Sequence, residues 1–129
     1  MIRIKKKIPQ KSFETAILFL VFNRPNTTKK VFDKICQLKP SKLYIASDGP
    51  RTTNKIERKK IEKVRQIVNK VDWPCKLKTL YRDKNLGCKK AVSSAIDWFF
   101  SFEKKGIILE DDCVPSLDFF YFCENLLIY

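Results

Sequence analysis

Short apolar runs recur along this chain, and each is followed by a stretch whose apolar residues repeat at helical spacing. The first run, 16–22, is continuous and rich in aromatic and branched residues, which is typical of a central strand covered on both faces. Shorter runs at 43–46 and 107–109 and an alternating segment at 76–81 extend the pattern. The sequence therefore predicts four strands, and the run at 107–109 is expected to be fully buried.

Four amphipathic helices are predicted after these strands, because apolar residues recur three and four positions apart. Thr27 or Thr28 is expected to cap the first helix, which extends as far as Pro40. The second follows Asn54, and its apolar stripe comprises Ile56, Ile61, Val64, Ile67, Val68 and Val71. Ser116 is expected to cap the fourth, whose apolar side comprises Phe119, Phe120, Cys123, Leu126 and Leu127. The third centres on 91–99, and Trp73 and Trp98 are interpreted as packing residues.

This alternation predicts an α/β, Rossmann-like fold: a mostly parallel sheet with right-handed crossovers and helices on both faces. The chain has 129 residues, enough for one domain with its own core. Residues 16–129 are expected to form that domain, and 1–15 a basic N-terminal arm.

The charge of the chain invites a second class of function. It has 27 basic against 14 acidic residues and a formal net charge of +13, a field that concentrates nucleic acids or anionic membranes. The basic residues cluster at 3–7 and 55–70, and the second cluster falls on the solvated side of a predicted helix. Most aromatic residues fall on strands or apolar helix faces, so a nucleic-acid-binding domain is kept as the less favoured alternative.

The five cysteines, at positions 36, 75, 88, 113 and 123, form no C-x-x-C pair, and the chain has no histidine to complete a zinc site. They are interpreted as small buried apolar residues of a reduced, cytoplasmic protein. No apolar run approaches the ~20 residues that span a bilayer as a helix. We therefore expect no membrane span, with peripheral contact to the inner face of a membrane left open.

Candidate chemistry lies where the predicted strands end. Glu110, Asp111 and Asp112 directly follow the last strand, and ligands of open α/β sheets bind at that edge. Such carboxylates can hold a divalent cation and, through it, a phosphate. The alternative is a solvated turn that caps the next helix. Asp48 follows the second strand at the same edge, where it either contacts a ligand or bonds its own backbone as a turn aspartate.

Two further candidate segments are weaker. Asn23 and Arg24 form the turn after the first strand, where Arg24 is either a ligand contact or a surface arginine before a proline. Lys89 opens the third helix, whose backbone N–H groups could receive an anion, although coincidence is the simpler account in a lysine-rich chain.

Taken together, these segments resemble the donor-binding half of a GT-A glycosyltransferase. They are similar to the N-acetylglucosaminyltransferase I type and to related bacterial sugar transferases. The resemblance covers 16 to about 127 and rests on 20–25, 45–51, 85–87 and 109–112, with Pro115 and 118–120. Its most specific part is Glu-Asp-Asp followed by a proline and Asp-Phe-Phe.

The resemblance implies a set of roles for a nucleotide-diphosphate sugar, with a UDP-sugar favoured, and for Mn²⁺ or Mg²⁺. Asp112 would be the metal ligand, and Asp111 would face ribose or sugar hydroxyls. Glu110 would support the loop beside the donor. Asp48 would accept a hydrogen bond from uracil or ribose, and Arg24 would lie against the base or the diphosphate. Asn23 and Lys89 complete the expected donor-binding set.

The chain also departs from that family. Members need a second half that carries acceptor recognition and, in inverting enzymes, a carboxylate general base, and neither is visible here. Members commonly use a histidine in donor contacts, and this chain has none. We therefore expect a domain that is incomplete at its C-terminus, with no catalytic residue and no acceptor identified. A non-catalytic nucleotide-sugar-binding module is the alternative.

Overall fold

The computed structural model describes residues 12–51 and 53–128, so most of the expected arm lies outside the described residues. Its elements are, in chain order, β1 (Ile17–Val21), α1 (Pro25–Leu38), β2 (Lys42–Ser47), α2 (Lys55–Val68), β3 (Lys76–Tyr81), α3 (Cys88–Phe100), β4 (Ile107–Glu110) and α4 (Leu117–Leu126). The strands form one parallel sheet in the order β3-β2-β1-β4. The predicted α/β, Rossmann-like fold is confirmed.

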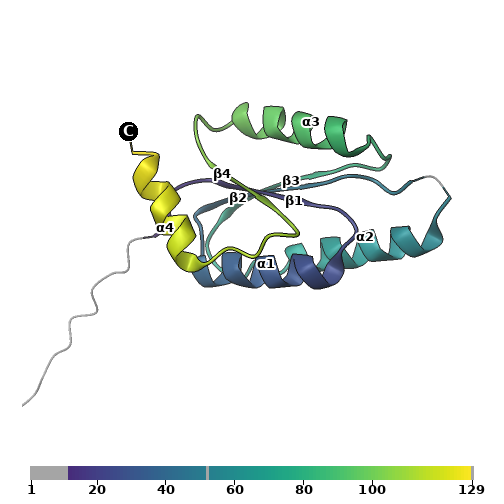
Figure 1. The fold of residues 1–129 in the computed structure, drawn as a ribbon, viewed down its shortest axis with the longest axis horizontal. Helices are drawn as coiled ribbons and strands as arrows, with labels where there is room; N and C mark the ends of the chain where they lie inside the picture. Colours follow the sequence, from purple (N-terminus) through teal and green to yellow (C-terminus); the bar gives the residue numbers. More distant parts are fainter. Residues whose placement is uncertain (1–11, 52, 129) are drawn as a thin grey trace, which may run out of the picture.

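Helices cover both faces of this sheet, with α1 and α2 on one face and α3 on the other (Figure 1). Strand β1 is central, and its side chains alternate between two cores. Phe19 lies in the larger core, together with residues of α1 and α2, and Leu18 lies in the smaller core with Tyr44 and Phe99. All three aromatic rings are buried. The continuous apolar run of β1 therefore reflects burial on both faces, as predicted.

Strand β4 lies at the edge of the sheet and is only half buried. Ile107 and Leu109 are buried, whereas Ile108 is 37% exposed and Glu110 is exposed. Within the described part of the chain β4 pairs with β1 alone. The prediction of a fully buried strand was wrong, because an apolar run of this length does not reveal how many neighbours the strand has.

The helix caps were partly predicted. Ser116 caps α4, and its Oγ accepts a hydrogen bond from the N–H of Phe119 at 3.2 Å. The prediction that Thr27 or Thr28 caps α1 was wrong, because α1 begins at Pro25 and has no side-chain cap. A proline suits the first helical position, since its fixed φ matches the helix and the N–H that it lacks would have no partner there.

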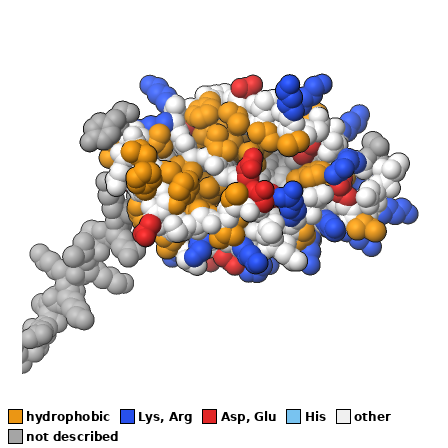
Figure 2. All heavy atoms as spheres, in the orientation of Figure 1, with side chains coloured by type: hydrophobic (Ala, Val, Ile, Leu, Met, Phe, Trp, Pro, Cys, Tyr) orange, Lys and Arg blue, Asp and Glu red, His pale blue; other side chains and the backbone are white. Residues whose placement is uncertain are grey.

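Two apolar stripes were misassigned. Ile56 of α2 is 69% exposed, and its neighbour Glu57 is buried instead. On α4, Phe120 is buried but Phe119 and Leu126 are 41% and 58% exposed. Figure 2 shows hydrophobic side chains gathered on the surface over α4. Helical spacing predicted both helices correctly, but not which side of each helix the sheet covers.

The interpretation of the cysteines was wrong, whereas that of the tryptophans was correct. All five cysteines are free. Cys88 and Cys113 are exposed and the other three are only partly buried, so their interpretation as buried residues was wrong. Trp73 is buried and donates a hydrogen bond from Nε1 to the carbonyl of Pro40 at 2.8 Å. Trp98 packs edge-on against Tyr44, with ring centroids 5.5 Å apart. Both tryptophans are packing residues, as predicted.

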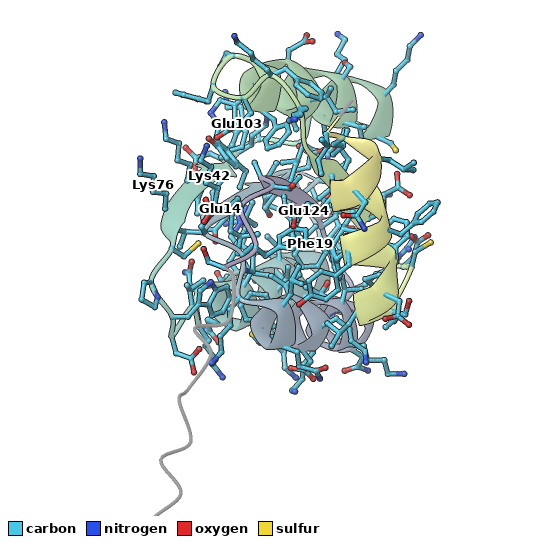
Figure 3. The ribbon with its side chains drawn as sticks, turned by 90° about the vertical axis from the view of Figure 1, so that its left-hand side faces the viewer. Glu14, Phe19, Lys42, Lys76, Glu103 and Glu124 are labelled. Atoms are coloured by element: carbon cyan, nitrogen blue, oxygen red, sulfur yellow. The ribbon has the colours of Figure 1, made fainter. Side chains whose placement is uncertain are left out.

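The amino end of the sheet is closed by polar contacts. Glu103, in the segment after α3, accepts a hydrogen bond from the Tyr44 hydroxyl at 2.8 Å and pairs with Lys42 at 3.3 Å (Figure 3). Burial, together with the Glu103 hydrogen bond, raises the pKa of Tyr44 to about 12. The hydroxyl therefore remains a donor at neutral pH and ties α3 to the sheet. In the described part of the chain, no helix has the length and apolar character needed to cross a bilayer.

Candidate functional site

A cavity of about 520 Å³ opens at the carboxyl end of the sheet. Its walls come from the segments after all four strands and from the first turns of α3. Strands β2 and β3 lie on one side of β1 and β4 lies on the other, so the chain reverses its winding direction between β1 and β4. Ligands of open α/β sheets bind at such a switch point. The fold therefore places this hollow where the architecture binds ligands.

Most of the candidate residues line this cavity. They are Asn23, Arg24, Asp48, Glu110, Asp111 and Asp112. Lys89 is exposed in the first turn of α3 and is not among the lining residues, although its neighbours Gly87 and Cys88 are. Sequence reasoning missed two arginines of the lining, Arg51 and Arg82, and also Glu57, which lies behind it.

The acidic segment after β4 faces an arginine from the end of β1. Arg24 Nη1 lies 3.8 Å from Asp111 Oδ1 and 3.6 Å from Asp112 Oδ2. The Asp111 side chain is 13% exposed and that of Asp112 is 48% exposed. In Figure 2 acidic and basic side chains lie together in the middle of the face between α3 and α1. The motif thus combines one sheltered carboxylate with one open to solvent.

The sheltered carboxylate is held in an unfavourable environment. Burial raises the pKa of Asp111 above its usual range, Arg24 lowers it, and the negative charge of Asp112 raises it further, with a net rise. A carboxyl group whose pKa is raised by folding binds its proton more tightly in the folded state. Ionised Asp111 therefore destabilises the fold at neutral pH, and a cation beside it would relieve that cost.

Replacing Asp111 with asparagine is expected to raise the melting temperature slightly at pH 7. The gain should vanish as the pH falls below the usual aspartate pKa of about 3.9, because the native carboxyl is then neutral as well. The exposed Arg24 pair that is lost contributes at most about 1 kcal/mol. Thermal melts of both proteins between pH 3 and 7 test this. A lower melting temperature at pH 7 would indicate that Asp111 instead stabilises a turn.

Asp48 is engaged by the loop that follows β3. Its Oδ1 accepts hydrogen bonds from the N–H groups of Gly49 at 2.8 Å and Leu86 at 2.9 Å, and its Oδ2 accepts one from Asn85 Nδ2 at 3.1 Å. The loops also touch at Gly49, where an added Cβ would lie 2.6 Å from the backbone of Lys84. Asp48 therefore links the loop after β2 to the loop after β3. It also accepts a hydrogen bond from the adjacent backbone, as the turn interpretation expected.

The variant Asp48→Ala is expected to lose about 1–2 kcal/mol of unfolding free energy, because Asn85 and two backbone N–H groups lose their acceptor. Asp48→Asn should lose less, since its amide oxygen can still accept the backbone hydrogen bonds. Urea denaturation of the three proteins measures both losses. Equal stability of Asp48→Ala and the native protein would contradict a role of Asp48 in linking the two loops.

Three arginines give the cavity a positive wall. Arg24, Arg51 and Arg82 come from the segments after β1, β2 and β3. Arg82 donates a hydrogen bond from Nη2 to Ser94 Oγ of α3 at 2.8 Å. From α2, the Arg65 guanidinium donates hydrogen bonds to the carbonyl oxygens of Arg82 at 2.7 Å and Asp48 at 3.2 Å. Arg82 is therefore held from both faces of the sheet.

The N-terminus of α3 also opens on this cavity. Gly87 is its N-cap, with a φ of 83°, and α3 has no side-chain cap. An added Cβ at Gly87 would meet nothing within 4 Å, so the space beside the first turn is free. Backbone N–H groups at a helix N-terminus attract anions. This end of α3 adds to the field of the three arginines.

The donor atoms of the acidic segment fit Mg²⁺ or Mn²⁺. Magnesium sites commonly use one or two protein carboxylates and take their remaining ligands from substrate phosphates and water. Asp111 and Asp112 supply two such groups at the cavity wall. Across residues 12–51 and 53–128, no three His, Cys, Asp or Glu side chains gather as a metal site. A cation held here would therefore need ligand oxygens from its phosphate partner.

Comparison with known proteins adds no relative to this picture. No family model, curated protein or solved structure matches the chain. The resemblance to GT-A glycosyltransferases therefore stays a hypothesis that rests on the motifs and on the geometry of the cavity.

Proposed function

We propose that this chain is the donor-binding half of a GT-A glycosyltransferase. It binds a nucleotide-diphosphate sugar, with a UDP-sugar favoured, through Mn²⁺ or Mg²⁺ and takes part in sugar transfer to an acceptor. The observation that carries this proposal is a single cavity that joins three arginines to the carboxylates of the Glu-Asp-Asp motif. Arginines alone would suit many anions, whereas arginines facing paired carboxylates suit an anion that arrives with a divalent cation.

Each side chain has a definite part in this proposal. Asp112, the more exposed carboxylate, would hold the cation. Asp111, which the resemblance places against ribose or sugar hydroxyls, would also supply a second oxygen beside the cation. The cation, when bound, would offset charge on the two phosphates. Arg24 pairs with both carboxylates in the ligand-free protein and would turn toward the phosphates when the cation takes its place. Arg51 and Arg82, from the segments after β2 and β3, would also contact the anion.

A non-catalytic nucleotide-sugar-binding module is the second candidate. Sugar transfer by inversion needs a free carboxylate base near the acceptor hydroxyl. Among the described residues of the cavity wall, Asp48 already accepts three hydrogen bonds, and the remaining carboxylates belong to the metal motif. That arrangement favours binding over chemistry by this half alone.

A thermal-shift panel tests the proposal. Saturating UDP with Mn²⁺ should stabilise the protein by about 2.7 kcal/mol at 100 times its dissociation constant, whereas uridine with Mn²⁺ should have little effect because it lacks the diphosphate. Guanosine diphosphate tests the preference for the base, and it should stabilise the protein less than UDP does. Stabilisation by uridine equal to that by UDP would contradict a diphosphate site.

A further inference from the structure

Glu57 is a buried carboxylate that the proposed roles leave unused. It is the third residue of α2, and its side chain is 8% exposed. A glutamate at this helical position commonly bonds back to the N-cap N–H in a capping box. Here the N-cap Asn54 donates its N–H to the Arg51 carbonyl at 3.4 Å instead. The Glu57 carboxylate is therefore directed to something other than its own helix end.

Its partners come from two loops of the cavity. Glu57 Oε2 accepts a hydrogen bond from Asn23 Nδ2 at 3.1 Å and pairs with Arg51 Nη2 at 3.2 Å. Glu57 Oε1 accepts the N–H of Arg51 at 3.0 Å. Asn23 follows β1 and Arg51 follows β2, and both line the cavity. One side chain thus fixes two residues that sequence separates widely.

The electrostatics of this contact favour a permanent charge. The hydrogen bond from the Arg51 N–H, aided by Asn23 and the Arg51 guanidinium, lowers the pKa of Glu57 below its usual range despite burial. The carboxylate is then ionised at neutral pH and holds its three partners continuously. Hydrogen bonds to a charged acceptor are about twice as strong as neutral ones.

The held residues keep groups that a ligand can use. Since Asn23 donates through Nδ2, its Oδ1 is the atom left to accept a hydrogen bond. The Arg51 side chain is 67% exposed, and its guanidinium carbon lies 5.7 Å from the centre of the Phe22 ring. The loop is fixed at its backbone, while the guanidinium remains accessible to an anion.

We infer that Glu57 is a positioning residue for nucleotide binding: it holds the Asn23 amide and the Arg51 loop in the arrangement that receives the nucleoside diphosphate. This inference rests on the proposed function. Glu57 touches no ligand itself and acts through Asn23 and Arg51.

The test is a double-mutant cycle of Glu57→Gln and Arg51→Ala, with UDP affinity measured by calorimetry in the presence of Mn²⁺. The introduced glutamine can still accept the Arg51 N–H through its amide oxygen, but its NH₂ group faces the other two donors. Glu57→Gln should weaken UDP binding about tenfold, roughly 1.4 kcal/mol. The two losses should be less than additive, because Glu57 acts through Arg51. Glu62→Gln, an exposed change on the same helix, is the control.

A second readout does not depend on the ligand. Hydrogen exchange of the Arg51 amide should accelerate in Glu57→Gln and stay native-like in Glu62→Gln. If the native protein binds no UDP, the proposed function fails while amide exchange still tests whether Glu57 orders the loop. Native-like exchange in Glu57→Gln would overturn the inference. Faster exchange with unchanged UDP affinity would overturn the positioning role.

Discussion

The variant Asp112→Asn is expected to bind UDP about 100-fold more weakly than the native protein when Mn²⁺ is present. Losing a residue that only supports a metal ligand typically costs 10–100-fold, so losing a ligand of a two-carboxylate site should reach about the upper end of that range. Metal-free UDP binding should change little or improve, because a negative charge near the phosphates is removed. Calorimetric titrations with and without Mn²⁺ measure both quantities.

Two matched variants make this result specific. Asp111→Asn should reduce Mn²⁺-dependent affinity less, because Asp111 is the more sheltered carboxylate and would supply only a second oxygen. Asp97→Asn changes an exposed aspartate on α3 outside the cavity wall and should bind as the native protein does. Equal affinity of the native and Asp112→Asn proteins with Mn²⁺ would leave the metal role without support.

The variant Phe99→Ala is expected to lose about 3–5 kcal/mol of unfolding free energy, as truncation of a fully buried phenylalanine usually does. Phe99 anchors α3 to the sheet, and its ring packs edge-on against Tyr44 with centroids 4.8 Å apart. Ring contacts of this kind add to the burial energy. Because α3 forms one wall of the cavity, ligand binding should weaken as well.

The adjacent residue provides the control. Phe100 is 44% exposed, so Phe100→Ala should cost about 1 kcal/mol, close to the typical value for a single mutation. Chemical denaturation of the two variants and the native protein gives the comparison. Similar losses in Phe99→Ala and Phe100→Ala would mean that α3 packs against the sheet through a different face.

Local patterns in the sequence were sufficient for the architecture. The continuous apolar run of β1 predicted a strand covered on both faces, and alternation with helical segments predicted the parallel sheet. Because ligands of open α/β sheets bind at the carboxyl ends of the strands, Arg24, Asp48 and the acidic motif were then expected at one edge of that sheet. Each of these inferences depends on residues close together in the chain or on a general property of open sheets.

The parts that were missed depend on contacts between distant segments. Ile56 is more hydrophobic than Glu57, so a stripe drawn from spacing alone places Ile56 inside. Glu57 is buried because Asn23, 34 positions away in the chain, and Arg51 supply donors for its charge. The exposure of Ile108 likewise depends on β4 having one neighbour in the described sheet. No local pattern carries that information.

For Asp48, too, local sequence could not show which groups the side chain contacts. The turn sequence alone allowed both a ligand contact and a turn aspartate. The donors from Asn85 and Leu86 lie 37 and 38 positions away, and they occupy the carboxylate in the ligand-free protein. A role in holding the cavity loops together is therefore clear from the geometry, whereas its part in donor recognition remains a prediction.

The most direct test of the central claim is calorimetric titration of UDP into the native protein with Mn²⁺ and again with a chelator. Saturable one-site binding is expected with Mn²⁺, and binding at least about 100-fold weaker is expected with the chelator, a difference of about 2.8 kcal/mol or more. Binding of equal strength in both titrations, or no binding with Mn²⁺, would contradict a metal-assisted nucleotide-diphosphate site at the Glu-Asp-Asp motif.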